Sequence, residues 1–511
     1  MENTYTQSDL SQDANNFHLT LLKHFSSDEM ALLVQLKRFF EWMQGDPAFT
    51  KQVSSGDFSP AVIERLHRIG ITFNFDELAI LWKFPDIAQR FLLNCNARHE
   101  EDLPEEMAQT IAQYPLFALW GKYLQTRNRL FRKYMGEVAA KSFRIPANPR
   151  LDAWRLRRIA AVRSELGFFS YILDHPLLAF ELSDGCSVGC WFCAFSTRKL
   201  TKNFDYLEHR DFFRQVAQIC AELFGRNQAS MALLYYGTEP HDNPHYLDFV
   251  KDYTEITGHP VCTSTAVPTD QAWMRELIAF YRQHHAPWPR LSVLSKAMLF
   301  KIHELYSPEE LRDVELLMQL KQGPRRKVTA GRILKEQDGL RNREEGHYLD
   351  DIVPQGSIAC VTGFLVNMVR GTVQLVSPCY TCQKWPYSYR IFDEATFSDA
   401  AGFRRAVETL IERNMPENPP KNMLVQFRDD LAYRPTEVGF DLASPNQVHH
   451  FRNASLHGPA GALIAEGTHT YAELYEIMTE QHKLNLIAVI MMVKKLFDDG
   501  FLNEVYTHPV Q

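Results

Sequence analysis

The segment FELSDGCSVGCWFC, residues 180–193, decides how the chain is interpreted. Cys186, Cys190 and Cys193 lie four and three residues apart, directly after an apolar run at residues 177–182 that is typical of a β-strand. Three thiols on one short loop indicate metal ligands. Structural zinc usually takes two close pairs of ligands, and no second pair follows at suitable spacing. The loop therefore suits a 4Fe-4S cluster with one open iron, and a zinc site with one distant ligand stays the alternative.

Length, composition and net charge limit the class of protein to which this loop belongs. The chain has 511 residues, enough for about three domains, and 45% of them are apolar. Its net charge of −7 gives no general attraction to nucleic acid or to an anionic membrane. The start carries no export signal, and the longest apolar stretch, Leu486 to Val493, is far below the ~18 residues of a membrane span. We therefore expect a soluble, cytoplasmic protein, in which nine cysteines are too few for a disulfide framework.

The pattern predicts an α/β fold preceded by helices. Residues 1–170 read as a helical domain, with a capping box at Ser26 to Glu29 and a basic stretch at 127–163 that we interpret as a solvated helix face rather than a docking site for an acidic peptide. Residues 171–378 alternate strands with amphipathic helices, which indicates βα units, about six of them, in an incomplete barrel. A hairpin is expected around Gly371. The expected strands are 177–182, 232–236, 260–266, 291–295, 326–329 and 359–366.

The sequence pattern of the last part of the chain predicts a small separate domain. We assign residues 379–445 to a post-barrel extension and 446–511 to a winged-helix-like unit, in which two helical stripes precede Gly500. From Leu456 onward there are three Lys against seven Asp or Glu, a balance that opposes contact with phosphates. The winged-helix pattern therefore does not favour DNA binding.

The cysteine spacing, with an aromatic Phe192 before the last cysteine, resembles the radical S-adenosylmethionine (SAM) superfamily. The resemblance implies a partial (β/α)6 barrel in which Cys186, Cys190 and Cys193 ligate a 4Fe-4S cluster. It also implies that SAM binds the open iron and is cleaved to methionine and a 5′-deoxyadenosyl radical.

Further segments resemble the SAM-binding elements of that superfamily. Gly237-Thr238-Glu239-Pro240 is similar to the GGEP loop that holds the SAM amino group, with Thr238 in place of the second glycine. Ser292 and Ser295, on the fourth expected strand, and Arg332, after Ala330-Gly331, occupy positions that the resemblance assigns to SAM contacts.

The segment SPCYTCQKWPYSYR, residues 377–390, closely resembles the post-barrel region of radical SAM peptide epimerases. These enzymes turn L-residues of ribosomally made precursor peptides into D-residues. The resemblance assigns to Cys379 the thiol that returns a hydrogen atom to the substrate, and Cys382 or Cys360 is the alternative donor. Three cysteines beyond the loop region do not favour an auxiliary cluster, which needs four ligands.

The termini and the chemistry imply partners. The C-terminal unit is similar to PqqD-like recognition domains, which bind the leader of a precursor peptide as an added β-strand. A one-electron donor such as ferredoxin or flavodoxin is also implied, and no nucleic acid or membrane partner is expected. Two other functions stay open: a radical SAM enzyme that crosslinks peptides through thioether or carbon–carbon bonds, and a cluster-containing winged-helix regulator. A crosslink removes two hydrogens from the product, whereas a regulator binds duplex DNA without cleaving SAM.

Overall fold

The computed structural model describes residues 17–96, 102–142, 144–284, 286, 289–321, 328, 330–334, 357, 359–444 and 446–504. The chain forms two compact units. The first comprises Met1–Phe143, Glu239–His241 and Cys262–Arg325, and the second comprises Arg144–Thr238, Asp242–Val261 and Arg326–Gln511. Each unit is described separately below.

The first unit begins with helices. The capping box at Ser26 is confirmed: its side chain accepts a hydrogen bond from the Glu29 backbone N–H, and the Glu29 carboxylate accepts one from the Ser26 N–H. Phe39 is fully buried and packs edge to face against Phe49 and Phe73. The elements are α2 (Phe17–Leu22), α3 (Ser27–Gly45), α4 (Pro47–Ser55), α5 (Pro60–Arg68), η1 (Phe75–Leu78), α6 (Ile80–Lys83), α7 (Pro85–Asn96), α8 (Glu105–Ala112) and α9 (Pro115–Ser142).

The same unit contains a parallel sheet, ordered β4-β5-β6. Strands β4 (Ser264–Thr265) and β5 (Arg290–Val293) confirm two of the expected strands, and α14 (Gln271–Gln283) and α15 (Lys296–Leu305) separate successive strands. Strand β6 (Glu315–Met318) was not expected, because its residues Glu-Leu-Leu-Met are all good helix formers.

The second unit is built on the sheet β1-β7-β8-β9. Strand β1 (Leu178–Glu181) pairs in parallel with β7 (Gly363–Asn367), which forms an antiparallel hairpin with β8 (Thr372–Pro378). This confirms the hairpin expected around Gly371, whose φ of 64° suits glycine. Strand β9 (Tyr389–Thr396) adds to β8 and was not expected. The expected strand at 232–236 is reduced to a parallel bridge between Ala179 and Leu233.

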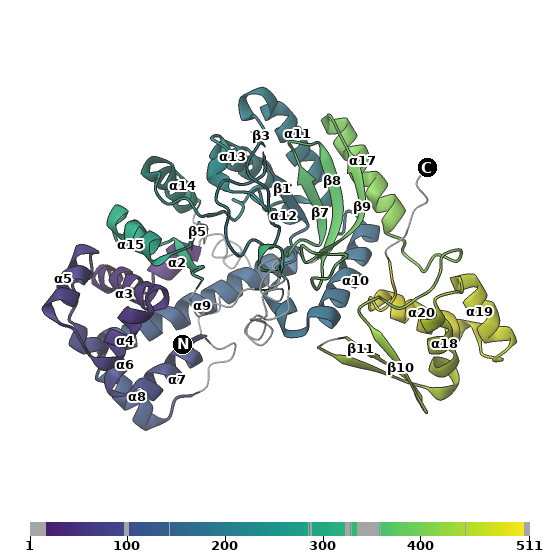
Figure 1. Cartoon of the computed structure of the whole chain (residues 1–511), viewed down its shortest axis with the longest axis horizontal. Helices are drawn as coiled ribbons and strands as arrows, with labels where there is room; N and C mark the ends of the chain where they lie inside the picture. The colour runs from purple at the N-terminus through teal and green to yellow at the C-terminus, as the bar shows by residue number, and fades with distance from the viewer. Residues whose placement is uncertain are drawn as a thin grey trace, which may run out of the picture. The chain divides into compact units, whose positions relative to one another are not determined.

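Helices cover one face of this sheet. The rings of Phe180 and Phe213 lie 6.3 Å apart, and those of Phe224 and Phe364 stack at 5.5 Å. Figure 1 shows α17 running alongside β8 and β9. The opposite face carries a cluster that includes Ala179, with Tyr236, Val361, Leu365 and Val376. The helices of the second unit are α10 (Pro149–Leu166), η2 (Gly167–Ile172), α11 (Tyr206–Phe224), α12 (Arg226–Ala229), α13 (Tyr246–Thr257) and α17 (Ala400–Asn414). The short η3 (Pro240–Asp242), which precedes α13, is divided between the two units.

The α/β class is observed, with parallel strands and intervening helices. Within the described ranges the strands form several separate small sheets and no closed barrel. The strand expected at 326–329 falls mostly outside the described residues. The partial (β/α)6 barrel therefore stays a prediction.

The C-terminal part of the second unit has its own core, which runs from Val425 to Leu502. It combines the antiparallel sheet β10 (Ala432–Thr436), β11 (Gly439–Ala443) and β12 (Val448–Arg452) with α18 (Ala454–Glu466), α19 (Tyr471–Glu480) and α20 (Leu486–Asp498). Figure 1 shows this group together at the yellow end of the chain. The boundary expected at residue 446 divides the β11–β12 hairpin, so the structural unit begins earlier. Two predicted helical stripes are confirmed as α19 and α20.

A buried ion-pair cluster joins this C-terminal core to α10. Arg157 and Arg158 contact the Glu504 carboxylate at 2.9 and 2.6 Å. All three side chains are at most 3% exposed. Such a cluster is stable only while every charge keeps its partner.

Among the described helices, none is both long enough and apolar enough to span a bilayer.

Candidate functional site

The two ends of the cysteine loop are two short strands that pair with each other. The loop leaves the short strand β2 (Ser183–Asp184) and returns to β3 (Lys202–Asn203), which pairs with β2. The Cys186 N–H donates to the Arg198 carbonyl at 2.9 Å. Gly185 has a φ of 104°, and a side chain there would lie 2.4 Å from the Lys199 carbonyl oxygen. The base of the loop is therefore closed by backbone contacts that require glycine at 185.

Arg332 forms hydrogen bonds with backbone groups in the middle of the cysteine loop. Its guanidinium donates to the carbonyls of Cys190 and Thr197, each at 2.7 Å, and its backbone N–H donates to the Cys193 carbonyl at 3.0 Å. The backbone of the preceding Gly331 lies so close to the cysteine loop that an added Cβ would be 2.2 Å from the Ala194 carbonyl oxygen. The predicted contact between Arg332 and SAM stays a prediction, and the contact present is with the loop itself.

Thr197 connects the loop to the predicted SAM-binding segment. Its hydroxyl donates to the Gly237 carbonyl at 2.8 Å, and its Oγ1 lies 3.7 Å from Cys193 Sγ. Gly237 has a φ of 68°, and the next residue, Thr238, donates its N–H to the Tyr235 carbonyl at 3.2 Å. Cys193, Gly237 and Arg332 are thus brought together. Sequence reasoning missed Thr197, because a single threonine after a cysteine motif carries no spacing signal.

The three loop cysteines bear on the two metal alternatives. All three are half-buried, and none forms a disulfide. Within the described part of the chain, no three His, Cys, Asp or Glu side chains converge on a point that one metal ion could occupy. A cubane cluster distributes its cysteine ligands over different iron atoms, so three thiols on one loop fit its chemistry without converging on one point.

Three other predicted SAM contacts belong to the first unit. Glu239 is buried, and its carboxylate accepts hydrogen bonds from the N–H groups of Ala266 at 2.9 Å and His241 at 3.1 Å and from the Thr265 hydroxyl. Ser295 caps α15, because its Oγ accepts from the Met298 N–H at 3.1 Å. Ser292 is half-buried on β5.

The candidate hydrogen donors lie in three different environments. Cys379, just after β8, is fully buried and donates its N–H to the Ser388 carbonyl at 2.9 Å. Burial raises the pKa of its thiol, while the nearby Arg390 lowers it and Glu165 raises it further. Cys382 is exposed, and Cys360 is half-buried against the core cluster of the sheet. A raised pKa keeps the Cys379 thiol protonated near neutral pH, which a hydrogen-atom donor requires.

The Cys379 segment lies beside the cysteine loop. The Gly331 N–H donates to the Pro386 carbonyl at 3.2 Å, and the next backbone N–H, that of Arg332, donates to Cys193. The ring of Phe195, two residues after Cys193, lies 6.3 Å from that of Tyr389. Two segments almost two hundred residues apart in sequence therefore meet here.

Glu181 is a further polar group at this end of the sheet. It ends β1 opposite Asn367 of β7, whose side-chain amide donates to Glu181 Oε2 at 2.6 Å. Burial raises the pKa of Glu181 to about 7, partly opposed by the Asn367 hydrogen bond. A Cβ added at Gly237 would lie 3.2 Å from Glu181 Oε1, so the carboxyl group lies next to the predicted SAM loop. Sequence reasoning missed Glu181 because one acidic residue at a strand end has no distinguishing pattern.

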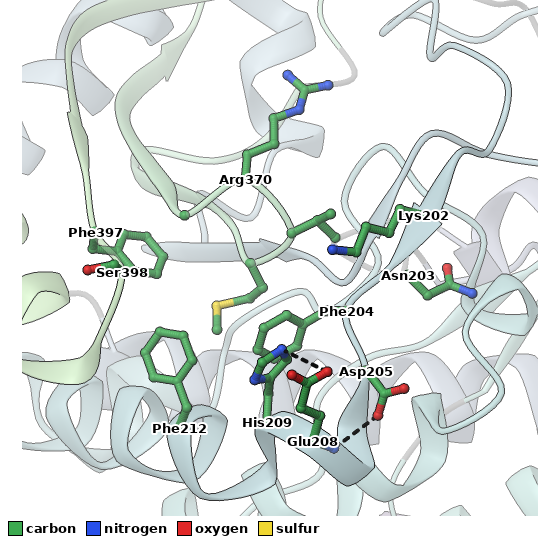
Figure 2. A pocket seen from close by; sticks show the side chains of 13 residues that line it. Lys202, Asn203, Phe204, Asp205, Glu208, His209, Phe212, Arg370, Phe397 and Ser398 are labelled. Atoms are coloured by element: carbon green, nitrogen blue, oxygen red, sulfur yellow. Dashed lines mark hydrogen bonds and ion pairs between the residues drawn. The ribbon is translucent and has the colours of Figure 1, made fainter.

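A cavity of about 290 Å³ lies at the base of the cysteine loop, beside β3. Figure 2 shows Phe212 and His209 of α11 on one side of it and Phe397 nearby, with the Phe212 and Phe397 rings 6.2 Å apart. Lys202 and Arg370 add positive charge, although Arg370 is paired with Asp184 at 2.7 Å. None of the predicted site residues lines this cavity.

Fold and site together define an α/β protein with a closed three-cysteine loop and an appended α+β domain. Residues 425–500 match the family model described as "Protein y4wI C-terminal domain". The whole chain is similar to "Uncharacterized protein y4wI" of Sinorhizobium fredii, with 32% identity over 509 residues that cover 98% of this chain and 94% of the relative. The chain belongs to the y4wI family. No solved structure matches it.

Proposed function

We propose that this protein is a radical SAM epimerase that converts L-residues of a ribosomal precursor peptide into D-residues. The observation that carries the proposal is the closed loop of Cys186, Cys190 and Cys193, joined through Gly331 and Pro386 to the segment of Cys379. Inversion at Cα needs two groups on opposite sides of the substrate carbon. One removes a hydrogen atom, and the other returns one.

The loop cysteines are the proposed ligands of a 4Fe-4S cluster. When bound and reduced, the cluster and SAM supply a 5′-deoxyadenosyl radical, which removes the Cα hydrogen of the substrate residue. The Arg332 guanidinium, bonded to two loop carbonyls, keeps the loop closed and places positive charge beside the thiolates. The proposed SAM contacts are Gly237, Thr238, Glu239, Ser292, Ser295 and Arg332.

Cys379 is the proposed source of the second hydrogen. Its S–H bond breaks homolytically as a new C–H bond forms on the opposite face of the planar Cα radical, which leaves a thiyl radical. One electron from a donor such as ferredoxin or flavodoxin and one proton from solvent restore the thiol. Complete burial of Cys379 and its raised thiol pKa support this role, because the hydrogen is retained until a substrate radical arrives.

The C-terminal domain is the proposed binding site for the leader of the precursor peptide. Strands β10 and β12 are the edges of its sheet, and an edge can accept an extended peptide as an added strand. Helix α20 also presents four exposed apolar side chains, which are Leu486, Ile487, Ile490 and Met491 at 40–68% exposure. Exposed apolar groups of this kind indicate a protein or peptide partner. We place this activity in the cytoplasm, with no nucleic acid and no membrane as partner.

The experiment that tests the proposal incubates the reduced full-length protein with SAM and with each short peptide that the reading frames next to its gene could encode, in deuterated water. We expect deoxyadenosine and D-residues that each gain one deuterium at Cα, because a thiol hydrogen exchanges with solvent. Cys186→Ala should abolish both products. A product that has lost two hydrogens would instead establish a crosslinking enzyme, and duplex binding without SAM cleavage would establish a regulator.

A further inference from the structure

Buried charges surround the Cys379 segment. Glu165, on α10, accepts hydrogen bonds from both terminal nitrogens of Arg390 at 2.6 and 3.1 Å. The same carboxylate accepts the Tyr380 N–H at 2.8 Å. The side chains of Glu165 and Arg390 are 2% and 12% exposed, so solvent screens this pair little.

The network continues into the C-terminal domain. Arg390 also lies 3.3 Å from Asp430, which pairs with the buried Arg428 at 2.8 Å. The charged and titratable groups that face the Cys379 thiol are Arg390 from β9, Glu165 from α10, Asp430 from the C-terminal domain and the neighbouring Cys382. With Arg428 included, two guanidinium groups face two carboxylates and the charge cancels.

This balance bears directly on the thiol. A cation next to a cysteine stabilises the thiolate, and a thiolate has no hydrogen to give. Arg390 favours the thiolate, and Glu165 opposes it. Glu165 also fixes the peptide N–H of Tyr380, the residue that follows Cys379.

We propose that Glu165 is a positioning residue for Cys379: its carboxylate fixes the backbone at Tyr380 and neutralises Arg390, so that the thiol keeps its hydrogen. The inference rests on the proposed function, in which Cys379 returns a hydrogen atom to the substrate. It adds a role for α10, a helix that carries none of the predicted site residues.

The test is the rate of Cys379 alkylation by iodoacetamide at one slightly alkaline pH in the full-length protein, followed by mass spectrometry, because burial holds the pKa of this thiol above the range in which a titration midpoint can be reached. Cys382→Ser serves as the background, because both cysteines lie between Arg370 and Lys384 and share a tryptic peptide. Glu165→Gln keeps the shape of the side chain and leaves one uncompensated positive charge. We expect the alkylation rate to rise about tenfold or more, because an uncompensated positive charge at short range lowers a thiol pKa by about one unit or more.

Two further variants make the expectation specific. Arg390→Gln should lower the alkylation rate, and the double variant Glu165→Gln with Arg390→Gln should return it toward the wild-type value. Glu394→Gln, exposed on the same strand, is the matched control and should leave the alkylation rate unchanged. Melting temperatures of all variants verify that each protein is folded.

The epimerisation assay gives a second measurement. In Glu165→Gln, the yield of D-residues per deoxyadenosine should fall relative to the wild type, because the thiol is less well positioned, while deoxyadenosine formation continues. An unchanged alkylation rate in Glu165→Gln, or an equal rise in the double variant, overturns this inference and leaves the proposed function intact. Undiminished D-residue formation by Cys379→Ser overturns the proposed donor instead.

Discussion

The contact of Arg332 with the cysteine loop allows a quantitative prediction. Its two charge-assisted hydrogen bonds, both 2.7 Å, join the carbonyls of Cys190 and Thr197. Lysine keeps the charge but has no planar fork, so Arg332→Lys can satisfy only one carbonyl at a time. A hydrogen bond to a charged group contributes roughly 1.5–3 kcal/mol. Because Arg332 is half-buried and solvent weakens its interactions, we expect Arg332→Ala to lose about 2–3 kcal/mol of loop stabilisation for the two bonds together.

Hydrogen–deuterium exchange of the loop measures this quantity directly. At tenfold per 1.4 kcal/mol, Arg332→Ala should accelerate exchange of the Ser196 amide, which bonds the Cys193 carbonyl, by roughly 30- to 150-fold. Arg332→Lys should lie between the wild type and the alanine variant. The control is Arg198→Lys, a more exposed arginine that pairs with Asp184. Exchange of the Ser196 peptide within about twofold of wild type in Arg332→Ala would refute the reasoning, since loop closure would then not depend on the guanidinium.

Three other predictions concern the donor, the C-terminal domain and a buried acid. Cys379→Ser should still form deoxyadenosine but yield no D-residues, because the O–H bond is too strong to give its hydrogen to the substrate radical; D-residues at normal yield would transfer the role to Cys382 or Cys360. Ile487→Ser with Met491→Ser, which are 68% and 67% exposed, should weaken leader binding in a titration without lowering the melting temperature, whereas Lys495→Ser should change neither. Burial raises the pKa of Glu181 to about 7, so the stability that its neutral carboxyl group contributes is present at low pH and is lost as pH rises through 7. The free energy of unfolding of Glu181→Gln should therefore rise relative to that of the wild type between pH 5 and 8, by about 3 kcal/mol at most. Parallel curves of unfolding free energy against pH for the two proteins would contradict this prediction.

Local signals predicted much of the secondary structure. The capping box at Ser26, the hairpin at Gly371 and the cysteine loop all depend on residues close in sequence, and each is present where it was expected. Strand β6 was missed for the opposite reason, since its identity comes from pairing with β5 and not from its own helix-forming residues.

The site was less predictable than the fold elements that carry it. The cysteine spacing marked the loop, but nothing in the sequence indicated that Arg332 bonds the loop carbonyls or that Glu165 reaches Arg390, 225 residues away. Such contacts link side chains that are far apart in sequence. A single residue within a helix or on a solvated face belongs to no sequence pattern that indicates its distant partner. The early start of the C-terminal core at Val425 was missed in the same way, because β10 and β11 become part of that core only through packing against its helices.

The ion pairs of Arg157 and Arg158 with Glu504 limit how freely the C-terminal domain can be exchanged. Under the proposed function the C-terminal domain binds the leader peptide, so exchanging it is a route to a new substrate, and a graft at residue 425 would follow the boundary of the core. Such a graft would leave two fully buried arginines on α10 facing a foreign surface. Removing the partner of a buried charge costs about 3–5 kcal/mol, a large share of the stability of a typical domain. The transferable module is therefore the C-terminal domain together with α10, and a chimera that swaps both but keeps Glu165 and Asp430, the partners of Arg390, should fold where the shorter graft fails.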